Sequence, residues 1–369
     1  MTENNPQNVS VQKYKKALTS AYSNPQGNQL RRLNTLTAMV CGAIRTSKSY
    51  LHSLGDGILQ DIDAESRVKV VKRWLLSEYN NYDVSFLPHI EPILSAYIAQ
   101  NKEMVFSIDG SEAGRGCTVL MISLTISNRA IPICWLAKKC KKGHLPARMH
   151  LEVFTLLHKL LKGYKNVVVL GDGEFDNGEV IAACADWEWH FVFRTAKNTV
   201  IFDGDEEYAI KYLAPPGNEL FFMASDVLYT KKRYGPVNAV VWSNRKLKEP
   251  IYLLSNFELT YQLACYYKKR WSIETMFSDM KSRGFNIHKS KISDSQRIEK
   301  LLIVICLAYI LVFRLGQQEY GGVYKAKITA KHKDDLSIFT YGKKLIEYCL
   351  KHSIQICFSF SKNCVVGTL

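Results

Sequence analysis

Apolar side chains recur at intervals of three and four residues throughout the first hundred residues. Such spacing places them on one face of a helix. Windows with this pattern cover residues 12–22, 28–44, 65–79 and 86–100. The sequences NPQG and GDG supply breaks between windows. We therefore expect residues 1–100 to form a helical region.

The pattern changes at residue 103, after which apolar residues occur in short runs rich in β-branched side chains. Such runs are typical of strands. Strands are expected over residues 104–108, 117–127, 131–137, 166–172 and 190–196. Helical periodicity returns over residues 150–164 and 174–187. Three consecutive strands followed by alternating helix and strand predict an α/β fold with a mixed sheet covered by helices.

Residues 197–255 interrupt this alternation. They hold several strand-like pieces, separated by loops such as APPGN and KKRYGP, and we interpret them as a β-rich insertion. A long helix is predicted from about Glu258 to Arg283, and another over residues 294–316. A mixed tail of strand and helix is expected to close the chain.

The composition is that of a globular protein with an excess of positive charge. Of its 369 residues, 47% are hydrophobic and 22% are charged, and the formal net charge is +15. This excess favours a polyanionic partner, either nucleic acid or an acidic membrane surface. The longest apolar run, residues 301–313, is shorter than the roughly 20 residues that cross a bilayer. We therefore expect nucleic acid as the partner, and no membrane.

The cysteines and the first residues bear on the compartment. The ten cysteines are scattered, without the close pairs of a zinc site, which indicates reduced thiols. The opening residues MTENNPQNVS are polar and lack the apolar core of a signal peptide. A cytoplasmic protein is expected.

Two aspartates follow apolar strands directly. Asp109 comes after the run MVFSI, and Asp172 after NVVVLG. Side chains at strand ends are where α/β folds place their chemistry. If the two strands are neighbours, the carboxylates meet, and a divalent metal would relieve their repulsion. The alternative for each aspartate alone is a helix cap or a turn residue.

A third carboxylate, Glu274, lies on the predicted long helix. With about 100° per residue, Tyr267, Arg270, Glu274 and Lys281 fall within a stripe about 60° wide. An adjacent apolar stripe, suited to packing on the sheet, contains Tyr266, Ile273, Phe277 and Met280. The helix can therefore bury one stripe and direct the other at a shared site. The alternative is a surface helix with an ion pair between Arg270 and Glu274.

The spacing Y-(2)-R-(3)-E-(6)-K is fully met by Tyr267, Arg270, Glu274 and Lys281. It resembles the signature of the DDE transposases of bacterial insertion sequences, in the branch numbered family four. The segments FSIDGSE and VVLGDGEFDN are similar to the two Asp segments of that family. The resemblance extends over roughly residues 100–315 in the order of elements.

This resemblance implies a domain organisation. Residues 101–196 and 256–320 would form a ribonuclease H-like mixed-sheet catalytic core, split by the β-rich insertion of residues 197–255. Residues 1–100 would be the helical DNA-binding region, and residues 321–369 a C-terminal region.

The resemblance also implies the chemistry of the site. Asp109, Asp172 and Glu274 would be the catalytic carboxylates and would hold two Mg²⁺ ions, with Mn²⁺ as a substitute. Oxygen ligands without His or Cys suit these metals. Arg270 and Lys281 would bind DNA phosphates beside the cut. Tyr267 would hydrogen-bond a phosphate or brace the helix.

The family cuts double-stranded DNA at the ends of its element, often through a hairpin intermediate, and joins the 3′ ends to target DNA. The implied protein acts as a homodimer assembled on DNA, at the nucleoid in the bacterial cytoplasm. In relatives the insertion helps to flip a base, which makes Trp242 a candidate for stacking on it. The alternative is a tryptophan packed within a small β core.

The N-terminal region is a candidate for recognising the element's terminal repeats. Ala38 and Gly42 are spaced as in a helix-turn-helix, and Arg45, Lys48 and His52 follow on the expected recognition helix. Two packed helices with a solvated basic face are the alternative. Arg31 and Arg32 are candidates for phosphate contacts in either case.

Other acidic residues near the three carboxylates have simpler interpretations. Asp176, Glu179 and Asp279 are expected to cap helices or to face solvent. Two further functions remain alternatives to the transposase. One is a ribonuclease H-like nuclease that cuts but never joins, and the other is a domesticated DNA-binding protein that has lost catalysis.

Overall fold

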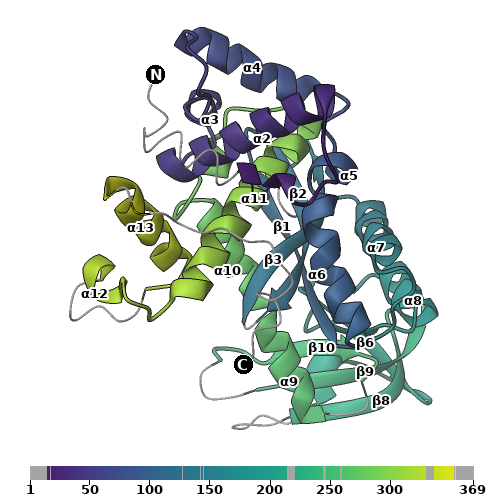
Figure 1. Ribbon diagram of the computed structural model, residues 1–369. Coiled ribbons are helices and arrows are strands. Elements are labelled where there is room, and N and C mark those ends of the chain that lie inside the picture. The colour runs from purple at the N-terminus through teal and green to yellow at the C-terminus, as the bar shows by residue number, and fades with distance from the viewer. Residues whose placement is uncertain are drawn as a thin grey trace.

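The fold is known from a computed structural model of the chain (Figure 1). It describes residues 15–16, 18–126, 128–141, 143, 145–213, 221–243, 247–257, 260–329, 336–352 and 354. Three parts follow one another along the chain: N-terminal helices, a mixed sheet covered by helices, and C-terminal helices.

The N-terminal part is helical, as its periodicity predicts. Its helices are α2 (Gly27–Thr46), α3 (Leu51–Gly55), α4 (Ala64–Leu76), α5 (Tyr82–Ser85) and α6 (Leu87–Ala99). The side chain of Asp63 caps α4 by accepting a hydrogen bond from Ser66 N at 2.8 Å. Most of the helix expected over residues 12–22 lies outside the described residues. The expected breaks at NPQG and near GDG agree with the start of α2 and the end of α3.

The N-terminal helices share their core with the sheet. Tyr82 donates a hydrogen bond from its hydroxyl to Ile133 O at 2.7 Å, and its ring meets Trp135 at 5.4 Å. Leu36 and Met39 of α2 belong to the same buried cluster as Ile122 of the sheet. The helices are thus packed directly against the sheet domain.

The sheet begins with three antiparallel strands followed by two parallel ones. Its first strands are β1 (Met104–Ala113), β2 (Cys117–Ile126), β3 (Arg129–Lys138), β4 (Val167–Gly171) and β5 (His190–Arg194). They lie in the order β3-β2-β1-β4-β5. β1 is antiparallel to β2 and parallel to β4, and β4 is parallel to β5. This confirms the predicted α/β mixed sheet, and the order and directions are those of a ribonuclease H-like core.

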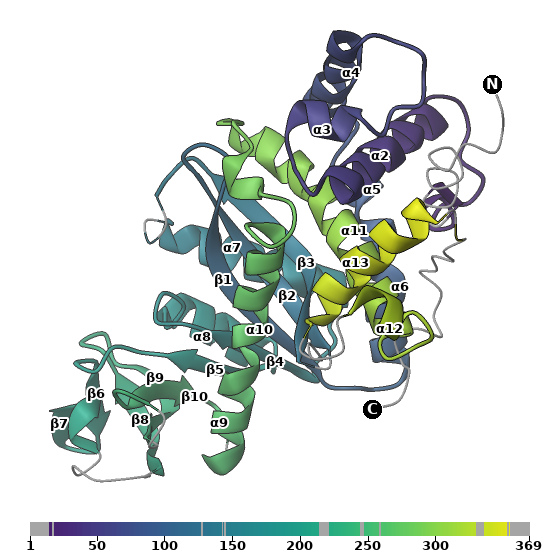
Figure 2. The same cartoon turned by 90° about the vertical axis from the view of Figure 1, so that its left-hand side faces the viewer.

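Helices cover both faces of these strands. Helices α7 (Ala147–Leu161) and α8 (Gly178–Asp186) provide the crossovers between parallel strands. Leu145, just before α7, lies against Gly110 of β1. A Cβ added to Gly110 would stand 3.5 Å from Leu145 Cδ1. The opposite face meets α10, whose Ser272 hydroxyl lies 3.1 Å from the Thr125 hydroxyl of β2. Figure 2 shows α10 in front of the strands.

The insertion extends the same sheet instead of forming a separate layer. Its elements are β6 (Val200–Asp203), β7 (Glu206–Ala209), the short 3₁₀ helix η1 (Ile210–Leu213), β8 (Phe221–Tyr229), β9 (Tyr234–Trp242) and β10 (Ile251–Ser255). β10 pairs with β5 in antiparallel fashion, and the full order is β3-β2-β1-β4-β5-β10-β9-β8-β6-β7. The prediction of a β-rich segment is confirmed, and its strands lie at one end of the sheet (Figure 1).

The long helix predicted from Glu258 to Arg283 is instead two helices, α9 (Thr260–Lys269) and α10 (Trp271–Met280). Around Arg270 the backbone bonds shorten to three-residue steps, from Arg270 N to Tyr267 O and from Ile273 N to Arg270 O. Tyr267 packs in one hydrophobic cluster and Ile273 in another. Since the two halves bury against different cores, a single straight stripe is not maintained.

Helix α11 (Ser295–Glu319) is the centre of the C-terminal part. Every residue from Leu301 to Gly316 is buried, which confirms the buried helix expected over 294–316. It follows the short 3₁₀ helix η2 (Ile287–Lys289) and precedes α12 (Lys325–Ile328) and α13 (Ile338–Lys351). Within the described ranges, none of the helices combines the length and apolarity needed to cross a membrane. The strand expected in the tail falls outside those ranges.

Candidate active site

Asp109 and Asp172 lie at the same edge of the sheet, on neighbouring strands. β1 and β4 are parallel, and the last printed pair of their register is Ser107 with Leu170. Two further residues along each strand bring Asp109 opposite Asp172. Neighbouring strands are about 4.8 Å apart, and residues at equal register point to the same face. The expectation that the two strands are neighbours is therefore confirmed.

Local backbone donors orient both aspartates. Asp109 is only 5% exposed, and its Oδ1 accepts a hydrogen bond from Gly110 N at 2.7 Å. Asp172 Oδ1 accepts from Glu174 N at 3.0 Å, in the turn that leads to α8. Asp172 thus stabilises a turn, which was the alternative interpretation of this residue from the sequence. It nevertheless lies opposite Asp109.

Tyr267 fixes α9 to the face of the sheet that carries the two aspartates. It is 1% exposed and packs with Val105 of β1 and with Val168 and Leu170 of β4. These positions alternate along the strands with the residues on the opposite face, so Val105 and Asp109 point to the same side. The buried ring favours the bracing role of Tyr267.

Arg270 and Glu274 lie beyond Tyr267 on the same side. Arg270 Nη2 donates to Glu274 Oε1 at 2.6 Å. The Arg270 side chain is 7% exposed and that of Glu274 is 49% exposed. The ion pair between Arg270 and Glu274, expected if the helix lies at the surface, therefore exists. Its guanidinium, however, is buried.

Charges from the two strands and from α10 meet around this pair. Burial lowers the pKa of Arg270, but Tyr267, Glu274 and Asp109 outweigh it, and the pKa is raised. Burial raises the pKa of Tyr267, with Arg270 and Arg194 opposing and Asp172 adding to the rise. Asp109 and Glu274 thus act electrostatically on Arg270, and Asp172 acts on Tyr267.

The three acids have the donor chemistry of a hard divalent cation: carboxylate oxygens alone. Asp109 lies within β1, Asp172 directly follows β4, and Glu274 is exposed enough to change rotamer. In the part of the chain that the structure describes, no three acidic, His or Cys side chains already converge closely enough to hold an ion. The three side chains fit such an ion in their chemistry, and Glu274 is held by Arg270.

Lys281 lies in the turn after α10 and is half-buried. It lines a small cavity together with Ser111 and Glu112 of β1. His288 is nearby, since burial and then Lys281 lower the pKa of its imidazole. Lys281 thus lies beside β1, just past Asp109. Because α10 ends at Met280, this position does not result from the helical stripe predicted from the sequence.

Two residues near the site were not foreseen. Arg194 ends β5 and is exposed, and its charge acts on Tyr267. His150 of α7 is 5% exposed. Burial lowers the pKa of its imidazole, and the nearby Asp172 opposes this effect only in part. Arg194 could have been found from its place at a strand end. A histidine in an amphipathic helix gave no comparable signal.

The expectations for two other aspartates are wrong. Asp176 neither caps α8 nor faces solvent: Asn177 is the cap, and Asp176 Oδ2 accepts a hydrogen bond from the Thr195 hydroxyl at 2.6 Å. Asp279 is 1% exposed. Burial raises the pKa of Asp279 to about 6, against the lowering effects of Arg283 and Arg129. Glu179 is exposed, as expected.

Trp242 is not available for stacking on a base. It is 7% exposed and packs with Leu263 and Tyr267, and Lys268 Nζ lies 5.2 Å from the centre of its ring. The alternative, a tryptophan within the β core, is confirmed. The stacking prediction is wrong because the inner strands β9 and β10 carry α9 on this face.

The expected recognition helix is also not formed. Arg45 lies in the last turn of α2 and donates to Asp56 O at 3.1 Å. Lys48 follows in a loop, and His52 is on the five-residue α3. Gly42 allows α2 to approach the following turn, since an added Cβ would stand 2.5 Å from Ser53 O. Close packing of these two helices explains the small residues.

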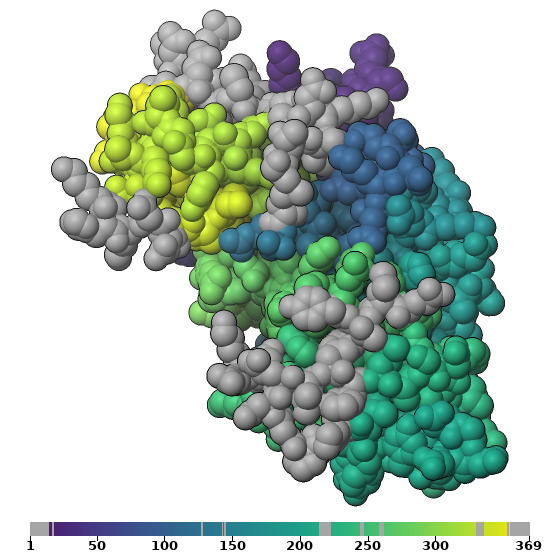
Figure 3. All heavy atoms as spheres, turned by 90° about the horizontal axis from the view of Figure 1, so that it is seen from below, coloured from purple at the N-terminus to yellow at the C-terminus, as the bar shows by residue number. Residues whose placement is uncertain are grey.

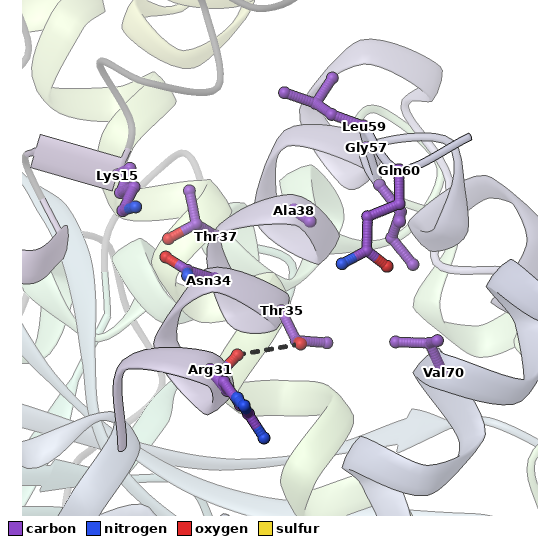
Figure 4. A pocket seen from close by; sticks show the side chains of 11 residues that line it. Lys15, Arg31, Asn34, Thr35, Thr37, Ala38, Gly57, Leu59, Gln60 and Val70 are labelled. Carbon is purple, nitrogen blue, oxygen red and sulfur yellow. Dashed lines mark hydrogen bonds between the residues drawn. The ribbon is translucent and has the colours of Figure 1, made fainter. Parts of the chain in front are cut away.

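Arg31 and Arg32 project from α2. Arg31 is exposed and lines a cavity of about 480 Å³ with Lys15, Asn34 and Gln60 (Figure 4). The Arg32 guanidinium lies 5.6 Å from the centre of the Tyr79 ring. Arg31 is thus at the surface of the N-terminal helices, and Arg32 is half-buried between α2 and Tyr79.

The strand order and the paired aspartates define a protein with a ribonuclease H-like core. Residues 110–311 match the profile of the transposase DDE domain, and the chain belongs to this family. The matched segment starts directly after Asp109 and includes Asp172 and Glu274.

Two solved structures are distantly similar. One is a piggyBac transposase synaptic complex with hairpin DNA, with a TM-score of 0.46 and 13% identity over 100% of this chain and 80% of that chain. The other is an endonuclease V variant from Ciona intestinalis in complex with an inosine-containing 23mer DNA. Its TM-score is 0.26 and its identity 15%, over 52% of this chain and 96% of that one. No curated protein matches the sequence.

Proposed function

We propose that this chain is a cut-and-paste transposase of the family-four branch, which cleaves double-stranded DNA at the ends of an insertion sequence and joins the 3′ ends to target DNA. The placement of Asp109 opposite Asp172, with Glu274 on the helix that crosses the same face, carries the proposal. Membership of the DDE family supports it.

Each residue of the site has a role in this proposal. Asp109 and Asp172 hold their carboxylates at fixed positions, because both belong to the sheet edge. Glu274 is the third ligand, and Tyr267 braces its helix against β1 and β4. Bound divalent ions, Mg²⁺ with Mn²⁺ as a substitute, would activate the attacking oxygen and stabilise the leaving one. Arg270 and Lys281 bind phosphates of the cleaved strand.

The insertion is proposed as a second DNA-binding surface. The turn between β8 and β9 holds Lys231, Lys232 and Arg233, all exposed, and Arg233 lies 4.6 Å from the Phe202 ring centre. Atoms of the insertion and of α9 adjoin on the underside of the molecule (Figure 3). A hairpin intermediate, a homodimer assembled on two DNA ends and a place at the bacterial nucleoid belong to the same proposal.

The test uses linear DNA carrying the element's end with Mg²⁺ or Mn²⁺. Cleavage is expected for the parent chain and for the control Glu179→Gln, which removes an exposed acid from α8. Asp109→Asn, Asp172→Asn and Glu274→Gln should each lower the cleavage rate by at least about 100-fold, since losing even an outer partner of a metal costs 10–100-fold. Equal rates for Glu274→Gln and the parent chain would refute the site.

Supplying pre-cleaved ends and a supercoiled target separates the remaining functions. Joined products are expected, and cleavage without joining would identify a nuclease instead. Binding to the element's end without metal-dependent cleavage by the parent chain would identify a domesticated DNA-binding protein.

A further inference from the structure

The third acid of the site is engaged with a buried arginine and not with the other two acids. Arg270 Nη2 and Glu274 Oε1 are 2.6 Å apart, and the guanidinium is on the buried side of the pair. A buried guanidinium needs a counter-charge, because an unpaired buried ion is costly. Glu274 supplies the hydrogen-bonded part of this charge, so its departure is favoured when another anion takes its place.

The arginine is fixed, while the glutamate is the partner that can move. The Arg270 guanidinium carbon lies 5.5 Å from the Tyr267 ring centre and 5.9 Å from that of Trp271. Arg270 itself stands at the junction of α9 and α10, and α9 is held by the packing of Tyr267. Glu274 is 49% exposed in its side chain. Of the two partners, Glu274 is therefore the one whose rotation would open Arg270 to another anion.

Half of the guanidinium fork is in use. Nη2 donates to Glu274, while the buried Nε has no hydrogen-bond partner among the residues that the structure describes. A phosphate offers two or more acceptor oxygens in the geometry that an arginine fork prefers. A phosphate would satisfy Nε and Nη2 together, which the single contact with Glu274 Oε1 does not.

Arg270 also opposes the binding of a cation. Its charge acts on both Asp109 and Glu274, so it stands among the same carboxylates that would hold the metal. A cation approaching these acids meets a fixed positive charge and lacks one ligand. Both effects end when an anion neutralises Arg270 and Glu274 is released.

We propose that Arg270 is a positioning residue that withholds Glu274 from the metal site until a DNA phosphate replaces Glu274 at the guanidinium. This inference rests on the proposed function, since it assumes that Glu274 is a metal ligand. DNA binding and divalent-ion binding then strengthen each other, and by linkage the factor is the same in both directions.

The test measures Mn²⁺ binding from the electron paramagnetic resonance signal of the free ion, with and without a DNA duplex. Mn²⁺ bound by the duplex alone is determined separately and subtracted. For the parent chain, saturating duplex should tighten Mn²⁺ binding about tenfold or more. For Arg270→Gln, binding without DNA should already be about tenfold tighter than for the parent chain, and the duplex should add less than about twofold.

The matched control is Lys269→Gln, which removes the same charge from the neighbouring position. Lys269 Nζ lies 4.8 Å from the centre of the Tyr266 ring, whereas the ion pair of Glu274 is with Arg270. The Lys269→Gln variant should therefore behave like the parent chain. Equal gains for Lys269→Gln and Arg270→Gln would mean that net charge alone acts, and would overturn the inference. Thermal unfolding of each variant, followed by circular dichroism, verifies folding.

If Arg270→Gln does not fold, the parent chain still decides the question. A Mn²⁺ affinity that does not change on addition of saturating duplex would overturn the inference. Failure of the proposed function looks different: Mn²⁺ binding would be absent in every condition, or would be the same after Asp109→Asn and Glu274→Gln.

Discussion

Asp279 of α10 is enclosed by protein, with Arg129 at the start of β3 and Tyr309 of α11 among its neighbours. The pairing of Asp109 with Asp172 was predictable because each follows an apolar run, although β1 continues past Asp109 to Ala113 and only β4 ends at the aspartate. The burial of Asp279 was not predictable, because its position on α10 is compatible with a solvated face. Only the packing of α10 against the start of β3 and against Tyr309 surrounds it with protein, as its electrostatic neighbours show.

The buried carboxyl of Asp279 should make stability depend on pH. Its pKa rises from 3.8 to about 6 on folding, so the native state binds the proton more tightly than the unfolded state. The free energy of unfolding should therefore fall as pH rises from about 4 to about 6, and stay low above that. Asp279→Asn should remove this fall and stabilise the protein at pH 7 by up to about 3 kcal/mol.

Urea unfolding of the parent chain and of Asp279→Asn at pH 4.5 and pH 7 measures this effect. Asp186→Asn, at the end of α8 on the protein surface, serves as the control. A parent chain more stable than Asp279→Asn at pH 7 would contradict the prediction.

At the scale of elements, periodicity identified the helices and strands but not how they meet. The interruption at Arg270 depends on two cores that Tyr267 and Ile273 enter separately, and no local signal in the sequence marks it. The same holds for α2 and α3, where the small residues reflect close packing and not a DNA-reading turn. The local pattern of apolar residues predicts whether a segment is a helix or a strand. How the elements pack against one another depends on residues that are distant in the sequence.

The crossing of α11 and α13 offers a test of such docking. Gly316 and Gly342 let the two helices approach, since a Cβ on Gly342 would stand 2.1 Å from Val312 O. Gly342→Ala should therefore destabilise the protein by about 1–3 kcal/mol through overpacking, although alanine favours helix by about 1 kcal/mol.

Chemical denaturation of Gly342→Ala is compared with Glu347→Ala, an exposed position on the same helix. The control should change the free energy of unfolding by no more than about 0.5 kcal/mol. A stabilised Gly342→Ala would show that the helices separate easily at this point.

At the scale of the molecule, the mixed sheet was predictable from the order of strands and helices along the chain. The extension of that sheet by the insertion was not, because the pairing of β10 with β5 joins segments separated by more than fifty residues. Strand-like pieces in the sequence reveal neither their partners nor their direction.

The net charge of +15 should make DNA binding depend on salt. Phosphate contacts release counterions, so the logarithm of affinity should fall linearly with the logarithm of salt concentration. Lys281→Gln should reduce this slope by about one unit if Lys281 contacts a phosphate. Fluorescence anisotropy of a labelled duplex gives the slope.

Lys159→Gln, an exposed residue of α7 behind the sheet, is the control for that measurement and should leave the slope unchanged. An affinity that is independent of salt in the parent chain would contradict binding of DNA through its phosphates.

The pairing of β10 with β5 also has a consequence for a chain that is still being synthesised. Asp109 and Asp172 both leave the ribosome well before Glu274, which lies more than a hundred residues after Asp172, and α9 follows β10 within a few residues. The strands of the insertion are therefore synthesised before α9 and α10, the helices that carry Tyr267 and Glu274. On the proposed site, a nascent polypeptide interrupted before α9 has two of the acids but no means of cutting the DNA that encodes it.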